Sequence, residues 1–289
     1  MNRVALGTAQ FGLEYGIANN TGRVPEREAR LILDGARAAG IDTLDTAVVY
    51  GDSEQRLGAL GLDGWRVITK VPAAPADCGD AASWLTRMVE ASIRRLRVPR
   101  LAAVLLHRPG QLAEPGGDAL YRGLEAVRAA GLVERIGVSI YDPGELDALE
   151  GRYQLDIVQA PFSIVDRRLA ESGWLDRLAQ ANVEVYVRSV FLQGLLLMDD
   201  RSRPPYFAPW ASLWLAWNEW LRAAGLRPIE ACLRYVLSCP GVARAVVGVD
   251  SHAQLQEIVE AAEGPIGAVP AGLSLSDPDL VNPSRWSVP

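Results

Sequence analysis

The chain has 289 residues, of which 49% are hydrophobic and 22% charged, and its formal net charge at pH 7 is −6. This balance is typical of a globular protein with a substantial core, and the negative charge argues against a broad surface for nucleic acid or anionic membranes. No apolar run is long enough for a signal peptide or a membrane span, and the three cysteines lack metal-ligand spacing, so we expect a cytoplasmic protein with reduced thiols and no metal.

Eight short, mostly apolar segments recur along the chain, and most are followed by a longer segment with helical spacing. They show little alternation between apolar and polar residues, as expected of strands that helices cover on both faces. We predict strands over residues 4–6, 43–45, 67–70, 102–107, 136–140, 157–160, 183–188 and 245–249.

Helices are expected between these strands. The first has a proline and acidic residues in its opening turn and ends at Gly40. Alternating strands and helices are typical of either a closed barrel or a doubly wound sheet. The predicted helices cover residues 25–40, 84–96, 119–130, 143–149 and 169–180.

The interval between residues 188 and 245 is longer than the other strand-to-strand intervals. Its four tryptophans fall roughly on one helical stripe, which favours core packing. Alternatively, a long loop after the seventh strand of a barrel would lie at the catalytic face and cover a substrate. These tryptophans are Trp210, Trp214, Trp217 and Trp220.

Polar residues end three neighbouring predicted strands. Asp45 ends the second, with Tyr50 five residues later, Lys70 ends the third, and His107 ends the fourth. The usual phosphate loops and the nucleophile elbow are absent from the sequence. A barrel enzyme works at the carboxyl ends of its strands, so we expect these four side chains to meet at one rim.

Together, these residues form a proton donor suited to carbonyl reduction. Hydride transfer leaves negative charge on the carbonyl oxygen, which must be stabilised and protonated. The Lys70 ammonium would make the Tyr50 hydroxyl a stronger acid, and Asp45 would keep Lys70 charged. His107 can donate a hydrogen bond to the substrate oxygen, and Tyr50 can then transfer the proton.

The segments around these residues carry motifs. Residues 45–54 read D-T-A-V-V-Y-G-D-S-E, residues 68–70 read I-T-K, and residues 105–109 read L-L-H-R-P. They resemble the signature, lysine and histidine segments of the aldo-keto reductases, and the resemblance runs from residue 6 to about residue 258. It implies a single-domain (β/α)8 TIM barrel over 1–289, with a long loop after strand 7. It also implies NAD(P)H binding without a Rossmann domain, and a catalytic tetrad of Asp45, Tyr50, Lys70 and His107.

The resemblance also implies cofactor-binding residues at the nicotinamide end. Gly7 and Thr8 would lie beside the nicotinamide ribose, and Ser139 and Gln159 would hold the carboxamide. Ile140 stands where the family usually has an asparagine, so one contact to the amide differs from the family pattern.

Further cofactor positions follow the last two strands. Arg188 and Ser189 align with the segment behind the nicotinamide, and Arg188 replaces a common aromatic ring, where it can stack or pair with a substrate anion. Gly248 and Gln254 match the last-strand motif. The family favours NADPH, whereas Asp250 beside a ribose would favour NADH by charge repulsion.

We therefore interpret the chain as an oxidoreductase that reduces an aldehyde or ketone with hydride from NADPH, or alternatively NADH, and with a proton from Tyr50. A cofactor-binding regulatory protein with little turnover, like family members that serve as channel subunits, is one alternative. A lyase that uses Lys70 as a Schiff base is another. We expect a small-molecule carbonyl substrate, no nucleic-acid or membrane partner, and a monomer. The aromatic residues that either line the pocket or pack in the core are Tyr15, Trp84, Trp210 and Trp214.

Overall fold

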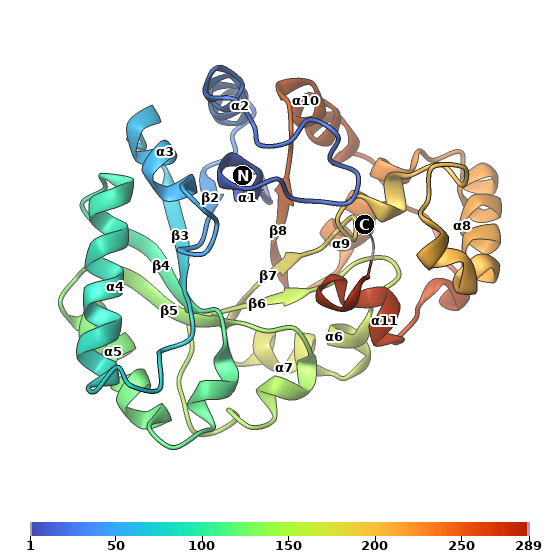
Figure 1. Ribbon diagram of the computed structural model, residues 1–289. Helices are drawn as coiled ribbons and strands as arrows, with labels where there is room; N and C mark the ends of the chain where they lie inside the picture. The colour runs from blue at the N-terminus through green and yellow to red at the C-terminus, as the bar shows by residue number, and fades with distance from the viewer. Residues whose placement is uncertain (1, 288–289) are drawn as a thin grey trace.

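A computed structural model describes residues 2–287 of the chain. Eight parallel strands close into a barrel in chain order, with β8 hydrogen-bonded to β1 (Figure 1). This confirms the (β/α)8 fold and excludes the doubly wound sheet, while the domain limits 1–289 stay a prediction. The strands are β1 Val4–Gly7, β2 Thr43–Asp45, β3 Arg66–Val71, β4 Leu101–Leu106, β5 Val133–Ser139, β6 Ile157–Pro161, β7 Glu184–Arg188 and β8 Val242–Gly248.

Helices form an outer layer around the barrel (Figure 1). The α-helices are α1 Ala9–Gly12, α2 Glu26–Ala38, α3 Ser53–Leu60, α4 Ala81–Leu96, α5 Gly117–Ala129, α6 Arg168–Glu171, α7 Trp174–Gln180, α8 Ala211–Ala224, α9 Pro228–Ser238, α10 His252–Ala261 and α11 Pro278–Val281. The 3-10 helices are η1 Pro109–Leu112, η2 Pro143–Leu146, η3 Leu195–Leu197, η4 Pro205–Trp210, η5 Ala271–Leu273 and η6 Pro283–Arg285. No helix within residues 2–287 is both long and apolar enough to cross a bilayer.

Local sequence explains how the outer helices begin and end. In α4, the Asp80 side chain accepts a hydrogen bond from the amide of Ala82, and Arg97 ends the helix in the left-handed conformation with φ 55°. These contacts satisfy backbone groups that a helix terminus leaves unpaired. The face that carries Leu85, Val89 and Leu96 is buried, so the amphipathic pattern decides which side of α4 packs inward.

Two predicted helices are wrong in detail. The single helix expected over 169–180 is two short helices, α6 and α7, because Gly173 takes a φ of 79° and interrupts the helical hydrogen bonds. The helix expected over 143–149 is only the short 3-10 helix η2, followed by turns.

The tryptophan-rich segment forms α8 and its approach, and the prediction of core packing is confirmed. Trp214 and Trp217 are buried in the main hydrophobic core. The tail covers this region, since Trp210 Nε1 donates to Asp277 Oδ2 at 3.1 Å and the Tyr206 hydroxyl donates to the carbonyl of Asp279 at 3.0 Å. In Figure 1, α8 and α11 accordingly lie on the same side of the barrel.

Candidate active site

The polar residues at the strand ends share one orientation. Side chains of a strand alternate between its two faces, so a residue two positions after an inward-facing residue also faces inward. Side chains from six different strands form one small cluster that includes Ile68, Leu105 and Ile157. Side chains from strands on different sides of a barrel can meet only inside it, so these residues face the barrel interior. Two positions after members of this cluster come six residues predicted for the site: Gly7, Lys70, His107, Gln159, Arg188 and Gly248. Asp45 and Ser139 also point to this side, because their side chains are hydrogen-bonded to Lys70 and Gln159.

A buried ion pair lies at the centre of this ring. Lys70 Nζ donates to Asp45 Oδ2 at 2.6 Å and to the carbonyl of Thr46 at 2.9 Å, and both charged side chains are buried. Burial by itself would lower the pKa of Lys70, but Asp45 and Tyr50 more than offset it, so the pKa is raised above its ordinary value. Lys70 is therefore an ammonium group at neutral pH.

Lys70 is the only lysine among the 289 residues, whereas arginine occurs throughout the chain. A guanidinium is larger and planar, and cannot replace a compact ammonium in a closed cavity. Lysine at this one buried position is a sequence signal that strengthens the assignment of a special role to Lys70.

Two further predicted residues hold the carboxylate of the pair. Gln159 Nε2 donates to Asp45 Oδ1 at 2.7 Å, and Ser139 Oγ donates to Gln159 Oε1 at 3.3 Å. Gln159 and Ser139 are fully buried and do not line the cavity described below. The structure thus brings them next to the ion pair, and their amide and hydroxyl groups bond within the protein.

Tyr50 lies on the loop between β2 and α3, above the ion pair. Lys70 Nζ is 5.0 Å from the centroid of the Tyr50 ring. The motif residue Ser53 anchors this loop by donating to the carbonyl of Thr8 at 2.9 Å. Glu54 anchors it as well, accepting from Thr69 Oγ1 at 2.6 Å. The signature residues around Tyr50 therefore fix the position of its ring.

The close approach of α1 to this loop gives a test. A Cβ on Gly12 would lie 1.9 Å from the carbonyl oxygen of Tyr50, so Gly12→Ala must displace the loop. We expect a loss of about 1–3 kcal/mol in the free energy of unfolding, measured in urea, and a lower kcat. Gly272→Ala is the control, since its Cβ would meet nothing within 4 Å. Equal stability of both variants would contradict the tight fit.

His107 faces Tyr50 from the end of β4. The two rings meet edge to face with centroids 6.2 Å apart. Burial, followed by the charges of Lys70, Arg188 and Arg108, lowers the pKa of His107 to about 3. The imidazole is therefore neutral at pH 7 and has no hydrogen bond to another side chain in residues 2–287, which leaves a ring N–H free for a substrate oxygen.

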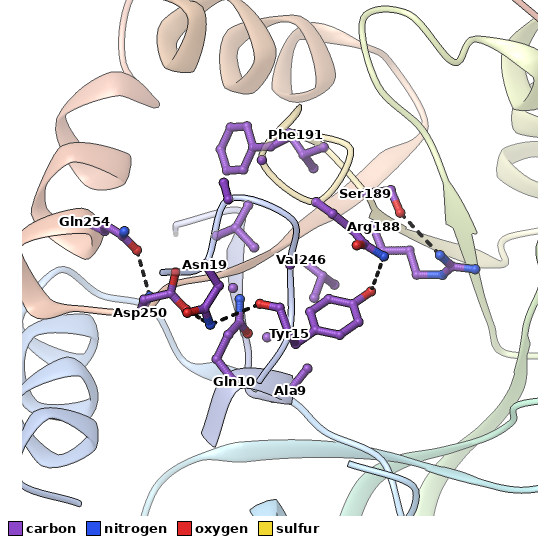
Figure 2. Close-up of a pocket in the computed structure, with 18 of the residues that line it drawn as sticks. Ala9, Gln10, Tyr15, Asn19, Arg188, Ser189, Phe191, Val246, Asp250 and Gln254 are labelled. Carbon is purple, nitrogen blue, oxygen red and sulfur yellow. Dashed lines mark hydrogen bonds between the residues drawn. The ribbon is translucent and has the colours of Figure 1, made fainter. Parts of the chain in front are cut away.

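A cavity of about 280 Å³ opens beside Tyr50 and Asp45. It extends from Arg188 and Ser189 at one end to Asp250 and Gln254 at the other (Figure 2). Of the predicted cofactor residues, those that line it are Gly7, Thr8, Arg188, Ser189, Gly248 and Gln254. Of the candidate aromatics, Tyr15 lines it, whereas Trp84, Trp210 and Trp214 do not and instead pack in or against the core.

Comparison with known proteins gives the family. The family model described as "Aldo/keto reductase family" matches residues 3–268. The chain belongs to the aldo/keto reductase family. It is 30% identical over 287 residues to an uncharacterised oxidoreductase of Mycobacterium tuberculosis, across 91% of this chain and 85% of that protein. It is 26% identical to the 6-dehydroglucose reductase of Novosphingobium aromaticivorans, across 89% and 87% of the two chains.

A solved structure supports the fold of this reductase independently. The holo form of aldo-keto reductase AKR11C1 from Bacillus halodurans superposes with a TM-score of 0.73 at 24% identity, over 91% of this chain and 87% of that one. The protein is thus an oxidoreductase of a family that reduces carbonyl compounds and generally uses NAD(P)H.

Sequence reasoning missed part of the cavity wall of the reductase. Asn19 lines it from the loop after α1, and Gln193 lines it from the loop after β7. In that second loop Ser189, Leu192 and Gln193 have positive φ values of 60°, 45° and 54°, a backbone strain that concentrates at functional sites. Nothing local in the sequence indicates left-handed conformations at such residues.

The depressed pKa of His107 predicts how the stability of the reductase depends on pH. Between pH 6.5 and about 3 the unfolded chain binds a proton at His107 and the folded protein does not, so stability falls as pH falls through this window. Above pH 6.5 this contribution is constant. Relative to His107→Gln, the wild type should lose about 2 kcal/mol of unfolding free energy between pH 7 and pH 5. Urea titrations at each pH measure this, and parallel curves would contradict it.

Proposed function

We propose that the protein reduces an aldehyde or ketone to an alcohol with a reduced nicotinamide dinucleotide, NADPH or NADH, and that Tyr50 donates the proton. The single observation that carries the proposal is the buried Asp45–Lys70 pair beneath Tyr50, with the neutral His107 opposite. Asp45 and Tyr50 line a cavity that extends to Asp250 and Gln254, while Lys70 and His107 lie behind its wall, against Tyr50.

Each of these residues has a separate role in the proposal. His107 donates a hydrogen bond to the carbonyl oxygen and orients it. The Tyr50 hydroxyl transfers its proton to the oxygen as negative charge develops there, and the Lys70 ammonium stabilises the resulting phenolate. Asp45 keeps Lys70 charged and in place, while Gln159 holds Asp45.

The residues of the cavity fit a dinucleotide. When bound, the nicotinamide supplies the hydride that adds to the carbonyl carbon. Small residues at the ends of β1 and β8, Gly7 and Gly248, leave room for a ligand against the backbone. Thr8, Arg188, Ser189 and Gln254 supply polar groups along its length. Ser139 and Gln159 would act on the nicotinamide through Asp45, to which Gln159 is bonded.

The contacts of Lys70 speak against a Schiff-base lyase. An amine must be neutral to attack a carbonyl, whereas Asp45 and Tyr50 raise the pKa of Lys70 despite its burial. The chain has one lysine. If the protein were a Schiff-base lyase, borohydride reduction in the presence of a carbonyl substrate would therefore modify the peptide that contains Lys70. We expect that peptide to stay unmodified.

The test is consumption of NADH and of NADPH by the purified protein with a panel of aldehydes and ketones, followed by absorbance. One relative is named a 6-dehydroglucose reductase, so sugar aldehydes belong on the panel. Turnover is the expected result. Nucleotide binding without turnover on any substrate would favour the regulatory alternative, and absence of binding would refute the proposal. The cytoplasmic location and the monomeric state stay predictions.

A further inference from the structure

The two ends of the cavity differ in charge. Asp250 follows β8, Glu257 lies on α10, and both line the cavity wall. Arg188 is at the opposite end (Figure 2) and is the one cationic side chain among the described residues that line the cavity. At the end formed by β8 and α10, a ligand that spans the cavity therefore meets two carboxylates, and none of the described lining residues there is cationic.

Asp250 is held in place by a neutral partner. Asn19 Nδ2 donates to Asp250 Oδ1 at 3.1 Å, while Asn19 Oδ1 accepts from the amides of Thr21 and Gly22, each at 2.9 Å. These bonds fix the orientation of the Asn19 amide. The Asp250 carboxylate also interacts with the Gln254 side chain and makes no ion pair within residues 2–287. Burial raises the pKa of Asp250, and the hydrogen bond with Gln254 opposes this shift, so the partners of this carboxylate are neutral amides and none is a cation.

The N-terminus of α10 is also occupied by the protein's own oxygens. The amide of His252 donates to Glu28 Oε1 at 2.6 Å, and the amide of Gln254 donates to Ser251 Oγ at 3.2 Å. The amide of Asp250 donates to Gln254 Oε1 at 2.7 Å. A helix N-terminus binds phosphate through free N–H groups. Here a carboxylate and two neutral oxygens already accept from these amides.

We propose that this end of the cavity selects NADH over NADPH, and that Asp250 is the specificity-determining residue. The proposal rests on the proposed function, which places the nicotinamide beside Tyr50 and hence the adenosine at the opposite end. The Asp250 carboxylate, which lines the cavity, accepts hydrogen bonds from the ribose hydroxyls of NADH. The 2′-phosphate of NADPH would face Asp250 and Glu257 with no cation on the described cavity wall to offset its charge. Repulsion between the phosphate and these carboxylates would weaken the binding of NADPH. This choice departs from the NADPH that the family resemblance favours.

The experiment measures binding rather than turnover. Isothermal titration of the wild-type protein with NADH and NADPH should give a Kd for NADH lower by about tenfold or more. Asp250→Asn keeps the acceptor oxygen that bonds Asn19 and removes the charge. In this variant we expect the affinity for NADPH to rise by about tenfold, while the affinity for NADH changes little.

Asp77→Asn is the matched control. It removes the same charge at an exposed position remote from the cavity, and the ratio of the two Kd values should equal that of the wild type. A wild type that binds NADPH as tightly as NADH, or an Asp250→Asn ratio equal to the wild type's, would overturn this inference alone. Failure of the wild type to bind either nucleotide would instead overturn the proposed function. The wild-type comparison decides the question even if a variant does not fold.

Discussion

Tyr50→Phe should lower kcat by about 10²–10⁴-fold while nucleotide binding stays unchanged. The substitution removes one hydroxyl from the ring that lies beside Lys70 and His107. Lys70 holds its proton tightly because Asp45 and Tyr50 raise its pKa despite burial, and the neutral imidazole of His107 is a very weak acid, so neither group replaces the hydroxyl as the proton donor. Steady-state kinetics and nucleotide titration of the variant measure both quantities.

Tyr15→Phe provides the matched control for this prediction. Tyr15 lines the same cavity, is 40% exposed, and accepts a hydrogen bond from Gln193 at 3.3 Å. Losing its hydroxyl should change kcat only a few-fold, as expected for a group that contributes one exposed hydrogen bond. Equal kcat values for Tyr50→Phe and the wild type would remove Tyr50 from the mechanism.

Lys70→Met should reduce both kcat and stability. The variant leaves the Asp45 carboxylate buried without its cation, which costs about 3–5 kcal/mol of unfolding free energy. It also removes the charge that stabilises the Tyr50 phenolate, so kcat should fall by about 10²–10⁴-fold. Urea unfolding and steady-state kinetics measure the two effects.

A double variant separates the two effects of Lys70. Asp45→Asn with Lys70→Met removes both buried charges, so much of the lost stability should return, because no unpaired charge remains. Its kcat should stay as low as that of the single variant. A double variant that regains both stability and kcat would show that the ion pair serves the fold and not the reaction.

The candidate site was predictable from sequence where its residues follow strands. Apolar runs identified all eight strands within a few residues, and three neighbouring predicted strands ended in the polar residues Asp45, Lys70 and His107. The signature around Tyr50 is contiguous in sequence, because Ser53 and Glu54 anchor the same short loop. Short-range patterns could therefore predict these positions.

Other features depended on contacts distant in sequence. Gln159 was expected to hold the carboxamide, yet its amide bonds Asp45, 114 positions earlier in the chain. Asn19 orients Asp250, 231 positions later.

The sequence by itself determined the alternation of strands and helices, the four residues proposed as the tetrad, and the residue type at each strand end. These features follow from periodicity and from motifs within a few residues, which can be identified without knowledge of the tertiary structure. Only the tertiary structure decided which of these residues line a cavity, that Asp45 is held by Gln159, and that one end of the cavity is acidic. Closing the barrel brings β1 against β8, and so places side chains in contact whose proximity no local pattern encodes.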